Sequence, residues 1–396
     1  MPTRWLDQLE IALIYAMAGF LFWPNAVSSI SMIGLIVLTL VRKRKAFLPS
    51  LKELILLLPA VLILVGWAVH GFTSAGEMEV QLWATWLGAL LYFRIGEQRR
   101  HFPTALALNS LAQAVVVLSV FVLSDHATAD NFSQFMRDQL GDIFGVHPTY
   151  VSAVWLWSGI WIVLERSWPV RYRQLTVGTL VIMAVLFGGK MAFIGFVAVI
   201  GWMILQQVKG TWKRLGMAGM LVVFMAGNIM LNPGLKARFG ELVTLNLDYQ
   251  EGQWLNSTEL RIGIWKCGID IASEHWLMGV GTGNTRAALD ACYERYGQVE
   301  FFETEFNSHN QYLHFMLTGG VFSALLFLTF FIWLFIQAIR RKQSTLIAFL
   351  LYAGLLLMTE NYFSRQSGMM FMAFVLMYLY FDQQSPEGSA ASTLAT

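Results

Sequence analysis

The sequence predicts an all-α membrane protein: a polytopic bundle of about twelve transmembrane helices with a helical outer loop before the tenth. Of its 396 residues, 56% are hydrophobic and 13% are charged, whereas a soluble domain has about 25% charged residues. The mean hydropathy is +0.55. Apolar runs of about 15 to 25 residues recur along the chain, which is long enough to cross a hydrocarbon core about 30 Å thick.

Twelve apolar runs each predict one spanning helix. They lie near residues 9–23, 26–41, 54–70, 80–93, 104–123, 148–164, 174–187, 191–206, 215–231, 310–337, 345–359 and 366–381. Residues 1–231 would then carry helices one to nine, residues 232–309 the outer loop domain, and residues 310–382 the last three helices. The tail 383–396, rich in Ser, Ala and Gly, is typical of a disordered cytoplasmic segment. The first run has no small-residue cleavage site behind it, so we expect an anchor and not a removed signal peptide.

Basic residues orient the bundle. Eighteen of the 27 Lys and Arg residues occupy the N-terminal segment and every second loop, and positively charged loops stay in the cytoplasm. Both termini are therefore expected inside, with the 232–309 loop outside. For most of the nine outer basic residues, an ion pair with acidic residues of that loop is the simpler explanation. Lys190 and Arg365 differ, because each lies in a very short turn between two spanning helices, where a charge is costly unless paired or functional. Two cations there suggest a bound anion.

The outer loop predicts two helices. Asn256 and the two residues after it can cap a helix from about Glu259 to Ser273, with an apolar stripe suited to lying on the bundle or the membrane surface. A second helix is expected from Asn284 to Gly297. Between them, residues 279–283 read Gly-Val-Gly-Thr-Gly. Alternate glycines can expose backbone N–H groups to a phosphate, but a turn between two helices is the favoured interpretation.

The only two cysteines, Cys267 and Cys292, fall on these two predicted helices. If the topology is right they lie on the oxidising side, where disulfides form. Two small buried apolar thiols are the alternative. The sequence leaves both open.

His309 is the best candidate for chemistry. It lies in the segment Phe306-Asn307-Ser308-His309-Asn310-Gln311-Tyr312-Leu313, and we expect Asn307 or Ser308 to cap the tenth helix with the imidazole in its first turn. The positive end of the helix dipole disfavours a second positive charge, so the imidazole would stay neutral and able to accept a proton. A structural histidine is the alternative. His147, before Pro148 at the start of the sixth helix, is a similar but weaker arrangement.

Taken together, these motifs resemble the signature of the O-antigen ligase and polymerase superfamily. The main ones are Arg261-x-x-x-Trp265, the glycine segment 279–283, the histidine segment 306–313, and Gly319-Gly320. His147-Pro148-Thr149-Tyr150, Gly189-Lys190-Met191 and the segment 360–368 are similar to its secondary motifs. The resemblance covers about residues 140–380. It implies a GT-C-like glycosyltransferase of the bacterial inner membrane that works on the periplasmic side without a nucleotide sugar.

The resemblance also implies substrates and roles. The donor would be a glycan on undecaprenyl pyrophosphate, moved en bloc to an acceptor hydroxyl, which in the ligase branch belongs to a lipid A-core sugar. His309 would be the general base, and Arg261 and Lys190 would hold the pyrophosphate, with Arg365 assisting. Many relatives have arginine where Lys190 stands, and lysine lacks the bidentate fork. The remaining expected substrate-binding residues are His147, Tyr150, Asn310, Tyr312 and Gly281. No Asp-x-Asp or His/Cys metal motif occurs, so we expect no metal or cofactor, and membrane lipids but no nucleic acid as further partners.

Two alternative functions stay open. A polymerase of the same superfamily would use the same site on a growing glycan, and the sequence does not separate it well from a ligase. A secondary transporter would also have about twelve helices. It should show internal repeats and polar residues at mid-membrane, whereas this chain shows no duplication and its polar motifs cluster at the outer edge.

Overall fold

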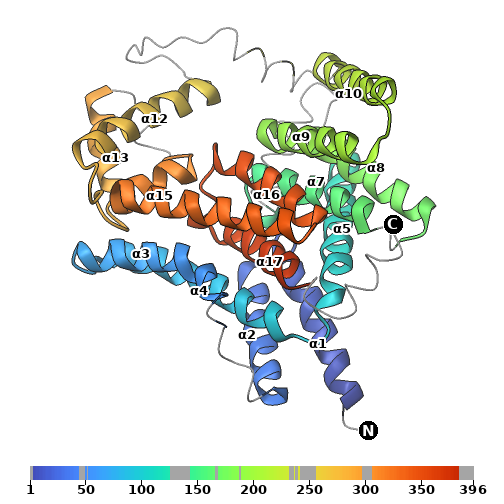
Figure 1. The fold of residues 1–396 in the computed structure, drawn as a ribbon, viewed down its shortest axis with the longest axis horizontal. Helices are drawn as coiled ribbons and strands as arrows, with labels where there is room; N and C mark the ends of the chain where they lie inside the picture. Colours follow the sequence, from blue (N-terminus) through green and yellow to red (C-terminus); the bar gives the residue numbers. More distant parts are fainter. Residues whose placement is uncertain are drawn as a thin grey trace.

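The structure is a computed structural model that describes residues 3–43, 50, 52–124, 143–165, 168–186, 189–231, 236, 240, 256–296 and 306–382. Within these residues all regular secondary structure is helical (Figure 1). The all-α prediction is confirmed for this part of the chain. The predicted tail 383–396 lies outside the described residues, as do much of the outer loop on either side of 256–296 and most of the loop between 124 and 147.

Each of the twelve predicted apolar runs overlaps one α-helix. These helices are α1 (Thr3–Ala18), α2 (Asn25–Arg42), α3 (Leu58–Val69), α4 (Ser74–Ile95), α5 (Phe102–Leu123), α7 (Pro148–Glu165), α8 (Val170–Leu186), α9 (Lys190–Gln207), α10 (Thr211–Leu231), α15 (Gln311–Arg340), α16 (Ser344–Leu357) and α17 (Gln366–Asp382). In the described part of the chain, four helical stretches are long and apolar enough to cross a membrane, namely Asn25–Arg42, Arg99–Leu123, Lys190–Gln207 and Gln311–Arg340, and three apolar helices are shorter. A multi-pass membrane protein is supported, and the count of twelve crossings stays a prediction.

Helix α17 forms the centre of the bundle. It is apolar on every side, and every residue from Ser367 to Phe381 is buried. A helix that is hydrophobic all round lies in a protein core or faces lipid, and here α17 packs against α4, α7 and α16 at the centre of the bundle (Figure 1). Its Phe374 packs edge-on against Phe20 and Phe102. Because α17 begins directly after Arg365, its burial fixes the position of the short 360–365 turn.

Helix α12 (Ser257–Glu274) begins with the predicted cap. The Asn256 side chain accepts hydrogen bonds from the N–H groups of Thr258 and Glu259, and the Glu259 side chain accepts one from Asn256 N–H, which completes a capping box. The apolar stripe of α12 is buried against α13 (Thr285–Tyr293) and the first turns of α15. The second outer helix ends at Tyr293 and continues as a 3₁₀ turn, Glu294–Tyr296, so the predicted helix end at Gly297 is too late.

Helix α15 is broken at Gly319 and Gly320, which have non-helical dihedral angles. The α12–α13 linker fills the break: Val280 N–H donates to Leu317 O (2.7 Å) and Val321 N–H donates to Trp276 O (2.8 Å). Gly320 has φ +70°, and a Cβ there would collide with the Leu277 backbone. The prediction of one continuous helix over 310–337 is therefore corrected to two segments, because backbone from the linker replaces helical hydrogen bonds.

Candidate functional site

Glu360 lies at the centre of the candidate site, in the turn between α16 and the 3₁₀ turn Tyr362–Ser364. Its side chain is only 8% exposed. One oxygen, Oε1, accepts a hydrogen bond from Arg261 Nη2 (2.9 Å) and lies 3.1 Å from His309 Nδ1. The turn thus joins the predicted general base to the predicted pyrophosphate-binding arginine.

The protonation state of Glu360 decides which nitrogen of His309 can act as a base. Burial alone would raise the pKa of Glu360, but the hydrogen bond and charge of His309, and then those of Arg261, outweigh it and lower the pKa to about 2. An ionised carboxylate can only accept hydrogen bonds. The His309 charge that lowers this pKa belongs to the imidazolium. When the ring gives up a proton, Nδ1 keeps the one that faces the carboxylate and Nε2 holds the lone pair.

The backbone of His309 is held in a conformation that few residues other than glycine adopt, with φ +40°. Its N–H donates to Asn307 Oδ1 (3.0 Å), and its carbonyl accepts from Trp265 Nε1 of α12 (3.3 Å). The cap of α15 is Asn310, whose side chain accepts from the N–H groups of Tyr312 and Leu313. The prediction that Asn307 or Ser308 caps this helix is wrong. His309 precedes the helix instead of lying in its first turn, since the Asn310 side chain satisfies the free N–H groups.

A buried amide next to Glu360 fixes the histidine turn. Asn361 Oδ1 accepts from Asn310 N–H (2.7 Å), and Asn361 Nδ2 donates to Ser308 Oγ (2.9 Å). Asn361 and Ser308 are almost fully buried. Because these bonds flank His309 on both sides, the 360–361 turn sets both the ring contact and the backbone of the histidine.

Lys190 and Arg261 lie near the same end of α12, its N-terminal end. Lys190 is the first residue of α9, and its Nζ donates to Thr258 Oγ1 (3.1 Å). Thr258 precedes Arg261 by three residues, so the two side chains lie on neighbouring positions of one helix face. The predicted ion pair within the outer loop occurs for Arg286 with Asp290. Arg261 instead pairs with Glu360, which lies outside that loop.

His147 and Arg365 lie in the electrostatic range of the same cluster. Burial is the largest cause of the lowered pKa of His147. The negative charge of Glu360 raises this pKa, and the positive charges of Arg261, His309 and Arg365 lower it further. His147 still presents part of its side chain to solvent, and its Nδ1 accepts from Thr149 N–H (3.3 Å). Arg365 is exposed. Both residues are therefore accessible at the rim of the site.

Four other predicted substrate-binding residues have structural contacts. Tyr150 is buried with its ring 4.9 Å from that of Tyr362, Asn310 is the helix cap, and the Tyr312 hydroxyl donates to Gly354 O of α16 (3.2 Å). Gly281 has φ +94°, and a Cβ there would collide with the His70 ring. The glycine segment is thus a turn packed on α3 and α4, which is its favoured interpretation from the sequence. A substrate contact for these four residues stays a prediction.

The structure joins Cys267 of α12 to Cys292 of α13 by a disulfide, with Cα atoms 5.8 Å apart. It ties the helix that carries Arg261 to the helix after the glycine turn. Among the described residues, no three His, Cys, Asp or Glu side chains gather as a metal site.

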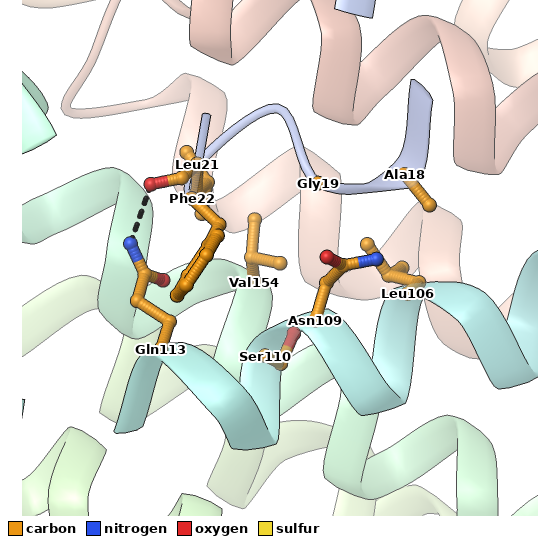
Figure 2. Close-up of a pocket in the computed structure, with 9 residues that line it drawn as sticks. All are labelled: Ala18, Gly19, Leu21, Phe22, Leu106, Asn109, Ser110, Gln113 and Val154. Carbon is orange, nitrogen blue, oxygen red and sulfur yellow. Dashed lines mark hydrogen bonds between the residues drawn. The ribbon is translucent and has the colours of Figure 1, made fainter. Parts of the chain in front are cut away.

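A small cavity lies away from this cluster, between the end of α1, α5 and α7 (Figure 2). Its volume is about 10 Å³, room for about one water. Its polar lining is internally paired: Figure 2 shows Gln113 donating to the Leu21 carbonyl, and Ser110 bonds to Ser158 (3.0 Å). The cavity is too small for a glycan or a lipid.

Residues 175–328 match the family model described as O-antigen ligase. This match supports, over that region, the resemblance to the O-antigen ligase and polymerase superfamily expected from the motifs. The matched region includes Lys190, Arg261 and His309 but ends before Glu360. Among curated proteins, none matches the chain. Glu360 and Asn361 were not predicted as site residues, although a carboxylate in so short a turn between two apolar helices is as costly as the cations that were singled out.

Proposed function

We propose that this protein is an O-antigen ligase-like glycosyltransferase. It moves a glycan en bloc from undecaprenyl pyrophosphate to a hydroxyl of a lipid A-core sugar, with His309 as general base. The observation that carries this proposal is the position of Glu360, which bonds both His309 and Arg261 through one buried oxygen. The family match supports the reaction class.

The base acts through Nε2 of His309. The acceptor hydroxyl gives its proton to Nε2 while its oxygen forms a bond to the anomeric carbon of the donor glycan. The bond from that carbon to the pyrophosphate oxygen breaks, and the electron pair leaves with the pyrophosphate. Glu360 holds the protonated Nδ1 and stabilises the imidazolium that forms, as a carboxylate does for a catalytic histidine in acyl transfer.

The leaving group needs positive charge and not a strong acid. Arg261, Lys190 and Arg365 supply three cations, and Glu360 removes one, so the formal charge of these four side chains is +2. This matches the about two negative charges of a lipid pyrophosphate diester, whose developing charge oriented cations stabilise. Arg261 has the fork geometry to bond Glu360 and a phosphate oxygen at once.

The proposed reaction takes place at the periplasmic face of the inner membrane, with both chain termini in the cytoplasm. This orientation rests on the basic loops.

The donor and the acceptor both reach the site from the membrane, and no metal takes part. A purified assay with EDTA tests the last point: activity lost on chelation and restored by a divalent ion would overturn it.

A deletion strain tests the function. Surface lipopolysaccharide on a gel should lose all polymer while lipid-linked glycan accumulates, and the wild-type gene should restore the polymer where a His309→Ala gene does not. A product with a single repeat unit would instead identify a polymerase of the same superfamily. Normal lipopolysaccharide would contradict both.

A further inference from the structure

Three consecutive apolar residues of the α12–α13 linker are exposed. Trp276, Leu277 and Met278 are 56%, 43% and 49% exposed. They follow the exposed polar residues Glu274 and His275, and no part of the proposed reaction uses them. A soluble surface rarely leaves a tryptophan and two further large apolar side chains adjacent and uncovered.

The position of the linker along α15 indicates how deep the linker lies relative to the membrane. Val321 N–H donates to Trp276 O, so the linker meets α15 where its second segment begins. That segment, Val321–Arg340, has about 20 residues and a length of about 30 Å, the thickness of a hydrocarbon core. A segment of this length that crosses the core would begin at the boundary between lipid and water.

The exposed face of the linker is continuous with an apolar face of α15. Phe322, Leu325 and Leu326 begin the second segment, and they are also exposed. Gly320 lies against the Leu277 backbone. The exposed apolar face of a helix that is able to cross a membrane thus adjoins the linker at Gly320 and Val321.

We propose that Trp276, Leu277 and Met278 insert into the lipid leaflet on the His309 side of the membrane and anchor the outer domain there. Tryptophan favours the membrane–water interface, and a short apolar patch beside polar residues is typical of interfacial insertion. Backbone groups at this depth need internal partners. Trp276 O has Val321 N–H, and Gly279 N–H donates to His275 O (2.8 Å).

The anchor limits the distance between the candidate site and the membrane surface. Trp276 follows the C-terminal end of α12, and Arg261 lies near the N-terminal end of the same 18-residue helix. Fixing one end in the leaflet limits how far Arg261 can move from the headgroup region. This consequence rests on the proposed function, but the insertion itself does not.

Site-specific labelling in lipid vesicles tests the insertion independently of activity. The full-length protein with Leu277→Cys carries one free thiol if Cys267 and Cys292 remain bridged, and a bimane dye is attached to it. Met278→Cys is the second probe if Leu277→Cys fails to fold. Asp270→Cys on exposed α12 is the aqueous control, and Leu325→Cys on α15 is the lipid control. Quenching is measured with phospholipids brominated on the acyl chain and with aqueous iodide.

The dye at position 277 should be quenched by brominated lipid to within about twofold of the Leu325→Cys label, as expected for a side chain at the acyl boundary. It should resist iodide more than the Asp270→Cys label. Strong iodide quenching without lipid quenching would overturn the proposal. Shielding from both quenchers would also overturn it, because a protein surface would then cover the linker.

Discussion

Glu360 Oε1 and His309 Nδ1 lie 3.1 Å apart although 51 residues separate them in the chain. The hairpin of α15 and α16 brings them together, and the same oxygen holds Arg261 at 2.9 Å. Because the carboxylate can only accept, the contact selects the His309 tautomer with a free Nε2. One buried acid therefore couples the orientation of the proposed base to the position of a cation.

Replacing His309 tests the base. His309→Ala should lower kcat by about 10²–10⁴-fold, the usual contribution of a general base, while membrane expression stays intact. His309→Asn should lose as much, since asparagine tolerates the positive φ at this position but cannot take the proton. The measurement is transfer from purified lipid-linked donor. The exposed His275 gives a matched control, and His275→Ala should remain near wild type. Near-normal turnover of His309→Asn would remove the imidazole from the mechanism.

Replacing Glu360 tests its action through His309. Glu360→Gln should lower kcat by at least about tenfold with a smaller change in KM, as for other groups that orient a functional histidine. The amide can donate to Nδ1 and so favour the wrong tautomer. Glu360→Asp keeps the charge and should recover part of the rate. Equal kcat values for the wild type and both variants would show that the carboxylate does not act on the base.

The lowered pKa of Glu360 predicts a pH-dependent contribution to stability. Its pKa falls from 4.5 to about 2 in the folded protein, so the stabilisation is present above pH 4.5 and is lost as the pH falls toward 2. In detergent, the thermal unfolding midpoint of the wild type should exceed that of Glu360→Gln at pH 7. The difference should shrink below about pH 4.5. A difference that stays constant from pH 7 to pH 3 would contradict a charged Glu360.

The sequence predicted the proposed chemical residues better than the residues that position them. His309 and Lys190 stand out because each places a polar or charged side chain at the edge of an apolar run, whereas Arg261 was predicted only through the family resemblance. Glu360 was not predicted because a carboxylate does not itself bind an anion. The carboxylate acts by meeting side chains from α12 and the histidine turn, a contact that no local pattern reveals.

The helices were predicted because apolar periodicity and length are local properties, but their ends depend on tertiary contacts. Asn307, Ser308 and Asn310 are all good N-cap residues. Asn310 is the cap because Asn361 fixes its backbone N–H and Ser308. The break in α15 likewise depends on the linker backbone. Its two hydrogen bonds to α15 join residues that are 37 and 45 positions apart, and the only local signal of the break in the sequence of α15 is its two glycines.

Charge at position 190 is the next test. Lys190→Arg should be tolerated far better than Lys190→Ala, since arginine also neutralises a phosphate. Thr258→Val removes the acceptor of the Lys190 hydrogen bond and should affect turnover less than Lys190→Ala, because the cation stays. Arg261→Ala should be the most damaging of the set, as it also leaves the buried Glu360 without its arginine. Steady-state transfer rates compare the four variants. Equal activity of the two Lys190 variants would mean that its charge is not used.

The Cys267–Cys292 disulfide closes a loop of 25 residues. The chain-entropy model predicts a stabilisation of about 3 kcal/mol for a loop of this size. Reduction should therefore lower the unfolding midpoint of the outer domain and loosen the contact between α12 and α13. A Cys267→Ala and Cys292→Ala double variant should match the reduced protein, which separates loss of the bridge from side reactions of the reductant.

Mass spectrometry after alkylation without reductant checks the bond itself in protein from the native membrane. Two freely alkylated thiols there would refute the bridge. They would also argue against the proposed orientation of the bundle, which puts both cysteines on the side where disulfides persist.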